Sequence, residues 1–208
     1  MKTGIENRWR SVITWSIFAR AGISAVFISL LFLVWNSSAR LDQELKAGGS
    51  QYAAAHNLRV EYKNEVQEWK NVLLRSKDSA GLEKNWQVFE NQYLKVADAA
   101  NSVTLHSDVR SINVKMAAFI EAHKDNYAQY KRSVDVFVRH GFDFRLADES
   151  VKGIDRPLLA ILDAVDMAVE EEKSNIVERL VAKSQNQIEQ TLIALALMVL
   201  IVVWKPKI

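Results

Sequence analysis

The sequence predicts an all-α protein, an antiparallel up-down-up-down four-helix bundle that is continuous with two transmembrane helices. Three observations lead to this fold class. The 208 residues include only 7 Gly, 2 Pro and no Cys, so few positions favour turns and no disulfide can cross-link the chain. A long apolar run lies near each end of the sequence. Between the runs, apolar residues recur at alternating steps of three and four, the heptad spacing of packed helices.

The first apolar run covers residues 21–35, which is short for a helix that needs about 20 residues to cross a bilayer. The residues just before it are also mostly apolar, and Arg20 can extend its charged end to the headgroups. We therefore predict a transmembrane helix over residues 15–36, preceded by a cytoplasmic tail at residues 1–14. A cleaved signal peptide is the alternative, because residues 37–39 resemble a small-residue cleavage site.

The second apolar run, residues 188–204, predicts a second transmembrane helix, followed by a cytoplasmic stub at residues 205–208. Residues 192–204 contain no polar side chain, so the alternative, a buried core helix of a soluble protein, would have no face for water. Trp204 and the lysines after it are typical of an anchor at the membrane surface.

The charge distribution predicts how these spans are oriented. Six of the 27 basic residues, but only one of the 25 acidic residues, lie outside residues 36–190. The positive-inside rule then keeps both ends in the cytoplasm and exports the middle. We expect a protein of the bacterial inner membrane with residues 37–187 in the periplasm. The net charge of +2 gives no support to nucleic-acid binding.

Four heptad series predict the helices of the bundle at residues 37–187. The turn between the first two series is expected at residues 76–81, Ser107 is the expected N-cap of the third, and Gly141 its C-terminal cap. Residues 142–150 are expected to be irregular, and Pro157 to lie in the first turns of the fourth helix. The inward positions of the first series are Leu41, Leu45, Gly48, Tyr52, Ala55, Arg59, Tyr62, Val66, Trp69 and Leu73. Those of the second are Leu82, Trp86, Phe89, Tyr93, Val96, Ala100 and Val103. Those of the third are Val109, Ile112, Met116, Phe119, His123, Tyr127, Tyr130, Val134 and Phe137, and those of the fourth Ile154, Leu158, Ile161, Val165, Ile176 and Leu180.

Two short motifs carry a family resemblance. Residues 65–75, EVQEWKNVLLR, resemble a segment in the ligand-sensing regions of many bacterial methyl-accepting chemotaxis proteins, although Ser76 follows where Gly is usual. Residues 151–157, VKGIDRP, are similar to the stretch that opens the last sensing helix in the same family. The resemblance implies a periplasmic sensing bundle, usually homodimeric, in which a small-molecule ligand or a periplasmic binding protein biases a small shift of the last helix.

In that family the shift passes to a HAMP linker and then to a cytoplasmic coiled coil that docks a histidine kinase. Because the sequence ends at Ile208, we expect either a truncated receptor or a stand-alone sensor that signals through a partner. Similar sensing bundles also head sensor histidine kinases and diguanylate cyclases. A membrane-tethered helical scaffold with no sensing role would show the same heptads, and is the alternative from a different class.

Polar residues that interrupt the heptads form the first candidate ligand site. Arg59, Asp98 and His123 lie at similar distances from the distal turns, so they are expected at one height in the bundle. Such a layer could bind an anionic ligand, because a guanidinium matches the geometry of a carboxylate. Alternatively, the layer fixes the helix register, or Arg59 swings outward while Leu58 packs inward.

The second candidate ligand site is the end of the bundle far from the membrane. Trp69, Asn71, Arg75, Asp155 and Arg156 come from the two family-like motifs and are expected to converge there. The structural alternative is that Trp69 is core and that an arginine pairs with Asp155 or caps a helix end. The resemblance keeps Arg75 as a candidate, since arginines at the dimer interface often hold the ligand in such receptors.

No enzyme is expected. The sequence contains no nucleophile elbow, no HExxH and no Gly-rich phosphate loop, and its four histidines do not fall at metal-ligand spacing on one helix. The acidic run at residues 170–172 fits a solvated helix face. We expect no cofactor, no resident metal and no chemical transformation of the ligand.

Overall fold

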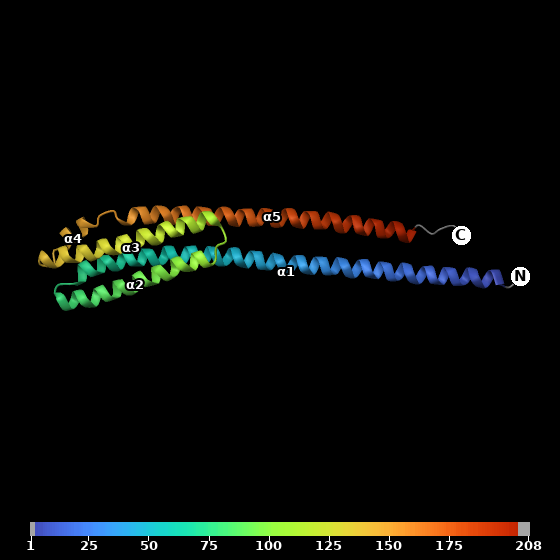
Figure 1. Ribbon diagram of the computed structural model, residues 1–208, viewed down its shortest axis with the longest axis horizontal. Coiled ribbons are helices and arrows are strands. Elements are labelled where there is room, and N and C mark those ends of the chain that lie inside the picture. Colours follow the sequence, from blue (N-terminus) through green and yellow to red (C-terminus); the bar gives the residue numbers. More distant parts are fainter. Residues whose placement is uncertain (1–2, 204–208) are drawn as a thin grey trace. The chain divides into compact units, whose positions relative to one another are not determined.

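The computed structural model describes residues 3–203, with side chains for 21–197, 199 and 200. The described chain contains five helices and no strand (Figure 1). The helices are α1 (Thr3–Arg75), α2 (Ser79–Leu105), α3 (Arg110–Arg139), α4 (Phe144–Ser150) and α5 (Asp155–Val203). They contribute to two compact units, which are described separately. One unit consists of Lys46–Asn175, and the other contains the parts of α1 and α5 outside that range.

The unit outside Lys46–Asn175 contains the predicted spans. By length and composition, one helix among the described residues is suited to cross a membrane: the part of α1 from Ala21 onward, whose most apolar stretch has a mean hydropathy of 1.7 and is not buried. The described large apolar residues of the second predicted span, such as Leu192 and Leu200, are also exposed. Trp204, the stub at 205–208 and the first two residues lie outside the described residues. The second span therefore stays a prediction.

The Lys46–Asn175 unit contains a core to which four helices contribute. Leu58 of α1, Val96 of α2, Phe119 of α3 and Leu162 of α5 are all nearly inaccessible to solvent and belong to one cluster. A second cluster joins aromatic residues of α1, α2 and α3 with Ala147 of α4. The four predicted heptad series therefore correspond to α1, α2, α3 and α5. Burial of these apolar side chains is the main stabilising contribution in this unit.

The inward face of α1 differs from the predicted one. Ala55, Tyr62 and Trp69 are buried as expected, but Leu58 replaces Arg59 and Glu65 replaces Val66 at the most buried positions between them. The prediction was wrong at these positions because α1 has neighbours on two sides and buries two adjacent lines of side chains along its length. One of these lines contains polar residues. The buried positions of α1 are Gln51, Ala55, Leu58, Tyr62, Glu65, Trp69, Val72 and Leu73. These positions follow heptad spacing, but a pattern defined by apolar residues alone does not include Gln51 and Glu65.

Local capping explains where α2 and α3 begin. The turn before α2 lies within residues 76–81 as predicted, and Asp78 caps the helix by accepting a hydrogen bond from the Gly81 amide at 2.7 Å. Ser107 is not the N-cap of α3, because Val109 occupies that position. The buried Ser107 hydroxyl instead accepts hydrogen bonds from the Val109 amide at 3.2 Å and from Gln51 Nε2 at 2.9 Å.

The end of α3 confirms the cap predicted at Gly141. Gly141 has φ +66°, and its amide bonds to the Val138 carbonyl at 3.1 Å. The next amide, that of Phe142, bonds to the Phe137 carbonyl at 2.8 Å, which completes a Schellman motif. The rings of Phe137 and Phe142 meet edge to face at 5.2 Å. These contacts hold Phe142 at φ +65°, where a residue with a Cβ is strained.

The segment predicted to be irregular contains α4. Asp143 caps this helix by accepting from the Arg145 amide at 2.9 Å, and Ser133 of α3 donates to the Ala147 carbonyl at 2.7 Å. A helix of 7 residues shows no heptad repeat, so periodicity alone could not reveal it. Pro157 lies in the first turn of α5 as predicted, where its missing amide hydrogen costs nothing.

Candidate functional site

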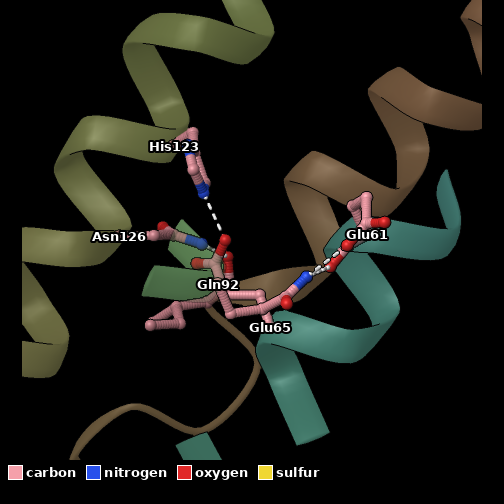
Figure 2. A network of polar contacts seen from close by, with 6 residues as sticks. Glu61, Glu65, Gln92, His123 and Asn126 are labelled. Carbon is pink, nitrogen blue, oxygen red and sulfur yellow. Dashed lines mark hydrogen bonds and ion pairs between the residues drawn. The ribbon is translucent and has the colours of Figure 1, made fainter. Parts of the chain in front are cut away.

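A buried polar pair joins α1 to α3. The Nε2 atom of His123 lies 2.6 Å from Oε2 of Glu65, and the two side chains are 3% and 1% exposed. Figure 2 shows the imidazole of His123 directed at this carboxylate. Hydrogen bonds in which one partner is ionised are shorter and stronger than those between neutral groups. The pair is therefore a strong polar contact inside the protein that joins two of its helices.

Aromatic rings enclose this pair. Tyr93 of α2 stacks on the His123 ring at 4.5 Å, Phe119 stacks on it at 5.6 Å, and Tyr62 meets it edge to face at 6.2 Å. Burial raises the pKa of the Glu65 carboxyl, while the hydrogen bond and charge of His123 act in the opposite direction and offset part of this effect. Burial is also the largest cause that raises the pKa of Tyr62 and of Tyr93.

Buried polar atoms without a hydrogen-bond partner within the described chain include Oε1 of Glu65 itself, the hydroxyl of Tyr62 and the indole Nε1 of Trp69. An unsatisfied buried polar group generally costs about 1–3 kcal/mol. The site therefore lowers stability relative to an apolar core. Such a cost is more common at functional positions than elsewhere in a core.

Two further groups of hydrogen bonds connect segments of this unit. Gln92 of α2 donates through Nε2 to Oε2 of Glu61 at 2.6 Å and to the Glu61 carbonyl at 3.0 Å. Asn126 of α3 donates to the carbonyl of Ile154, immediately before α5, at 2.8 Å. Figure 2 draws Glu61, Gln92 and Asn126 together with Glu65 and His123, and dashed lines join Gln92 to Glu61. The start of α5 is thus attached to the helix that carries His123.

Arg59 contacts two carboxylates of α5, a group that we call the Arg59 clasp. Its Nη2 lies 2.5 Å from Oδ1 of Asp163, and its Nε lies 2.6 Å from Oδ2 of Asp166. The Arg59 side chain is 22% exposed. The hydrogen bond that Arg59 donates to Asp163 is the largest cause that raises the pKa of Arg59. The clasp ties the middle of α1 to α5.

The predicted layer of Arg59, Asp98 and His123 does not form. Arg59 contacts α5, His123 bonds to Glu65, and Asp98 is exposed on α2. Similar heights along a bundle do not bring side chains together when they point in different directions around their helices. His123 is inward as predicted, but its partner is the residue at position 65.

The second candidate group is also separated. Trp69 is buried against Tyr130, with ring centroids 4.7 Å apart, and Asn71 donates to Glu68 at 3.1 Å. Arg75 and Arg156 are exposed, and no ion pair joins either to Asp155 among the described residues. The structure therefore fits the alternative of a core role for Trp69, and the proposed ligand roles of the others remain predictions.

The structure explains one residue of the family-like VKGIDRP motif. Gly153 has φ +79°, in the region that favours glycine, and a Cβ there would lie 3.4 Å from Nε of Arg156. This glycine allows the turn between Val151 and the start of α5. Backbone conformation thus explains the glycine of the motif without a ligand.

Sequence reasoning missed Glu65, Gln92, Asn126, Asp163 and Asp166. For Glu65 the available signal was its spacing of seven residues from the apolar Leu58 and Val72. No sequence signal distinguished the two aspartates from other exposed carboxylates of α5. Within the described residues, no group of three or more His, Asp or Glu side chains gathers as a metal site would require.

The all-helical fold, with polar side chains in its core, fits a chemoreceptor-like helical region. Over 101 residues, which are 49% of this chain, the sequence is 30% identical to the methyl-accepting chemotaxis protein CtpH of Pseudomonas aeruginosa. The matched segment spans only 18% of the length of that protein. No protein-family model matches the chain, and no solved structure matches it.

Proposed function

We propose that this chain is the transmembrane sensory module of a chemoreceptor-like protein, which detects an extracytoplasmic stimulus and transmits it by movement of its last helix. The observation that carries the proposal is the similarity over 101 residues to a methyl-accepting chemotaxis protein. The all-helical fold and the apolar part of α1 support it. In this proposal, residues 15–36 and 188–204 span the inner membrane, and residues 37–187 form a periplasmic four-helix bundle that works as a homodimer.

The contacts of α5 suggest how a stimulus would act. The Arg59 clasp attaches α5 to α1 through side chains that are 22% to 64% exposed. Ion pairs of this exposure each stabilise a fold by about 0–1 kcal/mol. The binding energy of a ligand is therefore large enough to replace these contacts between α1 and α5 with other contacts. Binding would then shift the population between two positions of α5 without any chemical change in the ligand.

Cysteine labelling tests the proposed topology cleanly, because the natural chain contains no Cys. Three single-cysteine variants are needed: Thr3→Cys, Asp125→Cys, where the native side chain is exposed, and Lys207→Cys. With a membrane-impermeant maleimide on intact spheroplasts, we expect labelling at position 125 alone. Positions 3 and 207 should react only after the membrane is permeabilised. Labelling at 207 from outside would leave the chain with one span and would contradict the proposal.

A chimera tests the sensory role. The full chain is joined after Ile208 to the HAMP linker and signalling half of a chemotaxis receptor, in cells without other receptors. Kinase activity is then measured while amino acids, organic acids and small cations are added one at a time. A stimulus-dependent change that disappears in a chimera without residues 46–175 supports sensing. Constant kinase activity with every compound, in a chimera that is folded and inserted, would indicate a scaffold instead.

A further inference from the structure

A groove of about 320 Å³ lies between α1 and α5 in the Lys46–Asn175 unit. Tyr52 and His56 line it from α1, and Asp166 and Glu170 line it from α5. We call it the Tyr52–Glu170 groove. The remaining lining residues are Ala55, Met167 and Val169, of which Ala55 and Val169 are buried. The groove therefore combines an apolar floor with an aromatic wall and an acidic wall.

An ammonium group of the protein itself occupies part of this arrangement. The Nζ atom of Lys173 lies 5.2 Å from the centre of the Tyr52 ring and 3.2 Å from Oε1 of Glu170. A cation over a tyrosine ring at this distance is attracted by the negative face of the ring. The neighbouring His56 ring is nearly parallel to that of Tyr52, with centroids 6.5 Å apart. The ammonium of Lys173 thus already lies between the Tyr52 ring and the Glu170 carboxylate at this end of the groove.

Two of the lining residues, Asp166 and Glu170, are carboxylates. Asp166 pairs with Arg59, which also pairs with Asp163, and Glu170 pairs with Lys173. This set of three carboxylates and two permanent cations has a net negative charge, which favours a further cation. The described side chains do not gather as a metal site, so an organic cation fits the aromatic and apolar lining better than a metal ion does.

We propose that the Tyr52–Glu170 groove binds a small protonated organic amine, with its ammonium over the Tyr52 ring and beside Glu170, in place of the ammonium of Lys173. The inference rests on the proposed function, since it names the class of ligand that the sensory module would detect. The groove is bounded by α1 and α5, the two helices joined by the Arg59 clasp. A bound amine would thus favour one position of α5. Lys173 acts as an internal competitor.

Calorimetric titration of the full chain in detergent micelles tests the proposal, with n-butylammonium chloride as the probe. The neutral analogue 1-butanol and sodium chloride at equal ionic strength are the reference titrations. We expect butylammonium to bind and the references not to. Removal of the competitor in Lys173→Gln should tighten binding. Tyr52→Ala and Glu170→Gln should each weaken it by about 2- to 5-fold, and Tyr52→Phe, which keeps a ring, should weaken it less.

Lys152→Gln is the matched control. Lys152 pairs with Glu149 three residues away at 3.0 Å, much as Lys173 pairs with Glu170, but no cation–π contact of Lys152 occurs within the part of the chain that the structure describes. Its substitution should leave the affinity for butylammonium unchanged. Circular dichroism of every variant shows whether it has folded. The inference is overturned if neither the natural chain nor Lys173→Gln binds butylammonium, if 1-butanol binds equally well, or if both lysine substitutions have the same effect.

The chimera separates failure of this site from failure of the proposed function. A chimera that responds to some other compound, combined with no butylammonium binding, would refute the amine site and leave the sensory role standing. Butylammonium binding that depends on Tyr52, in a chimera that never changes its kinase activity, would support the site and contradict the sensory role.

Discussion

Glu65 of α1 and His123 of α3 contact each other at 2.6 Å in a part of the core where both side chains are at most 3% exposed. Each side chain is the main polar partner of the other, and their contact offsets the free-energy cost of removing both from water. Aromatic rings surround the imidazole, so a missing partner could not be replaced by solvent without opening the core. Stability should therefore respond more to the loss of one member than to the loss of both.

Replacing His123 tests this dependence. His123→Phe leaves the Glu65 carboxyl buried without its partner, and we expect the free energy of unfolding at neutral pH to fall by about 3–5 kcal/mol. The double variant His123→Phe with Glu65→Met should recover a large part of that loss. Urea unfolding of the full chain in micelles, followed by circular dichroism, measures both. His140→Phe, at an exposed position, is the control. Equal losses in the single and double variants would contradict the pairing.

The pH dependence of stability gives a second test. Burial raises the pKa of Glu65 above its ordinary value of 4.5 in the folded state. The folded protein then retains a proton that the unfolded chain has already released, so this group makes stability fall as pH rises from 4.5 through the raised pKa. Glu65→Gln removes that contribution. We expect the natural chain to lose stability more steeply than Glu65→Gln across that interval, and parallel curves would show that Glu65 does not titrate in this way.

Trp69 should contribute strongly to stability. It is 3% exposed and lies against the rings of Tyr130 and Phe89, at 4.7 and 6.1 Å. Trp69→Ala should lower the free energy of unfolding by about 3–5 kcal/mol, because it leaves a cavity between these rings. Leu74→Ala, at a position that is 60% exposed, should change it by less than about 0.5 kcal/mol. If the two substitutions have similar effects in urea unfolding, the packing described for Trp69 is incorrect.

Substitution of glycine by alanine should lower the stability at Gly153 and Gly141 and raise it at Gly49. Gly153 and Gly141 have φ values of +79° and +66°, where a Cβ costs roughly 1–2 kcal/mol. Gly153→Ala and Gly141→Ala should destabilise by similar amounts, because a Cβ at Gly153 meets the Arg156 side chain only at van der Waals distance, 3.4 Å, and nothing lies within 4 Å at Gly141. Gly49→Ala, inside α1, should raise stability by about 0.5–1 kcal/mol. Melting temperatures measure these changes, and a neutral Gly153→Ala would contradict the prediction.

Local sequence was sufficient to predict most helices and some of their ends. Heptad spacing located α1, α2, α3 and α5, and the turn near Asp78 and the cap at Gly141 follow from the chemistry of those residues. It was insufficient for α4, which is too short to repeat a pattern and is held by Ser133. It was also insufficient for the row of α1 that contains Glu65, since periodicity was judged from apolar residues alone.

The candidate site was harder to predict because its contacts join different helices. His123 was expected to point inward and does so. Predicting Glu65 as its partner would have required knowing how α1 is rotated about its own axis. A shift of one position along α1 corresponds to about 100° of rotation. This shift also explains why Arg59 meets Asp163 and Asp166 on α5 instead of joining His123. Heptad spacing fixes such rotations only approximately.

The unbonded indole N–H of Trp69 has a spectroscopic consequence. Trp69 lies among the rings of the second core cluster, with its Nε1 buried and unpartnered in the described chain. An indole in such apolar surroundings fluoresces at shorter wavelength than one in water. In a variant that keeps Trp69 and replaces the other five tryptophans with Phe, the emission would report on this core cluster alone. Any rearrangement that admits water there should move that emission to the red.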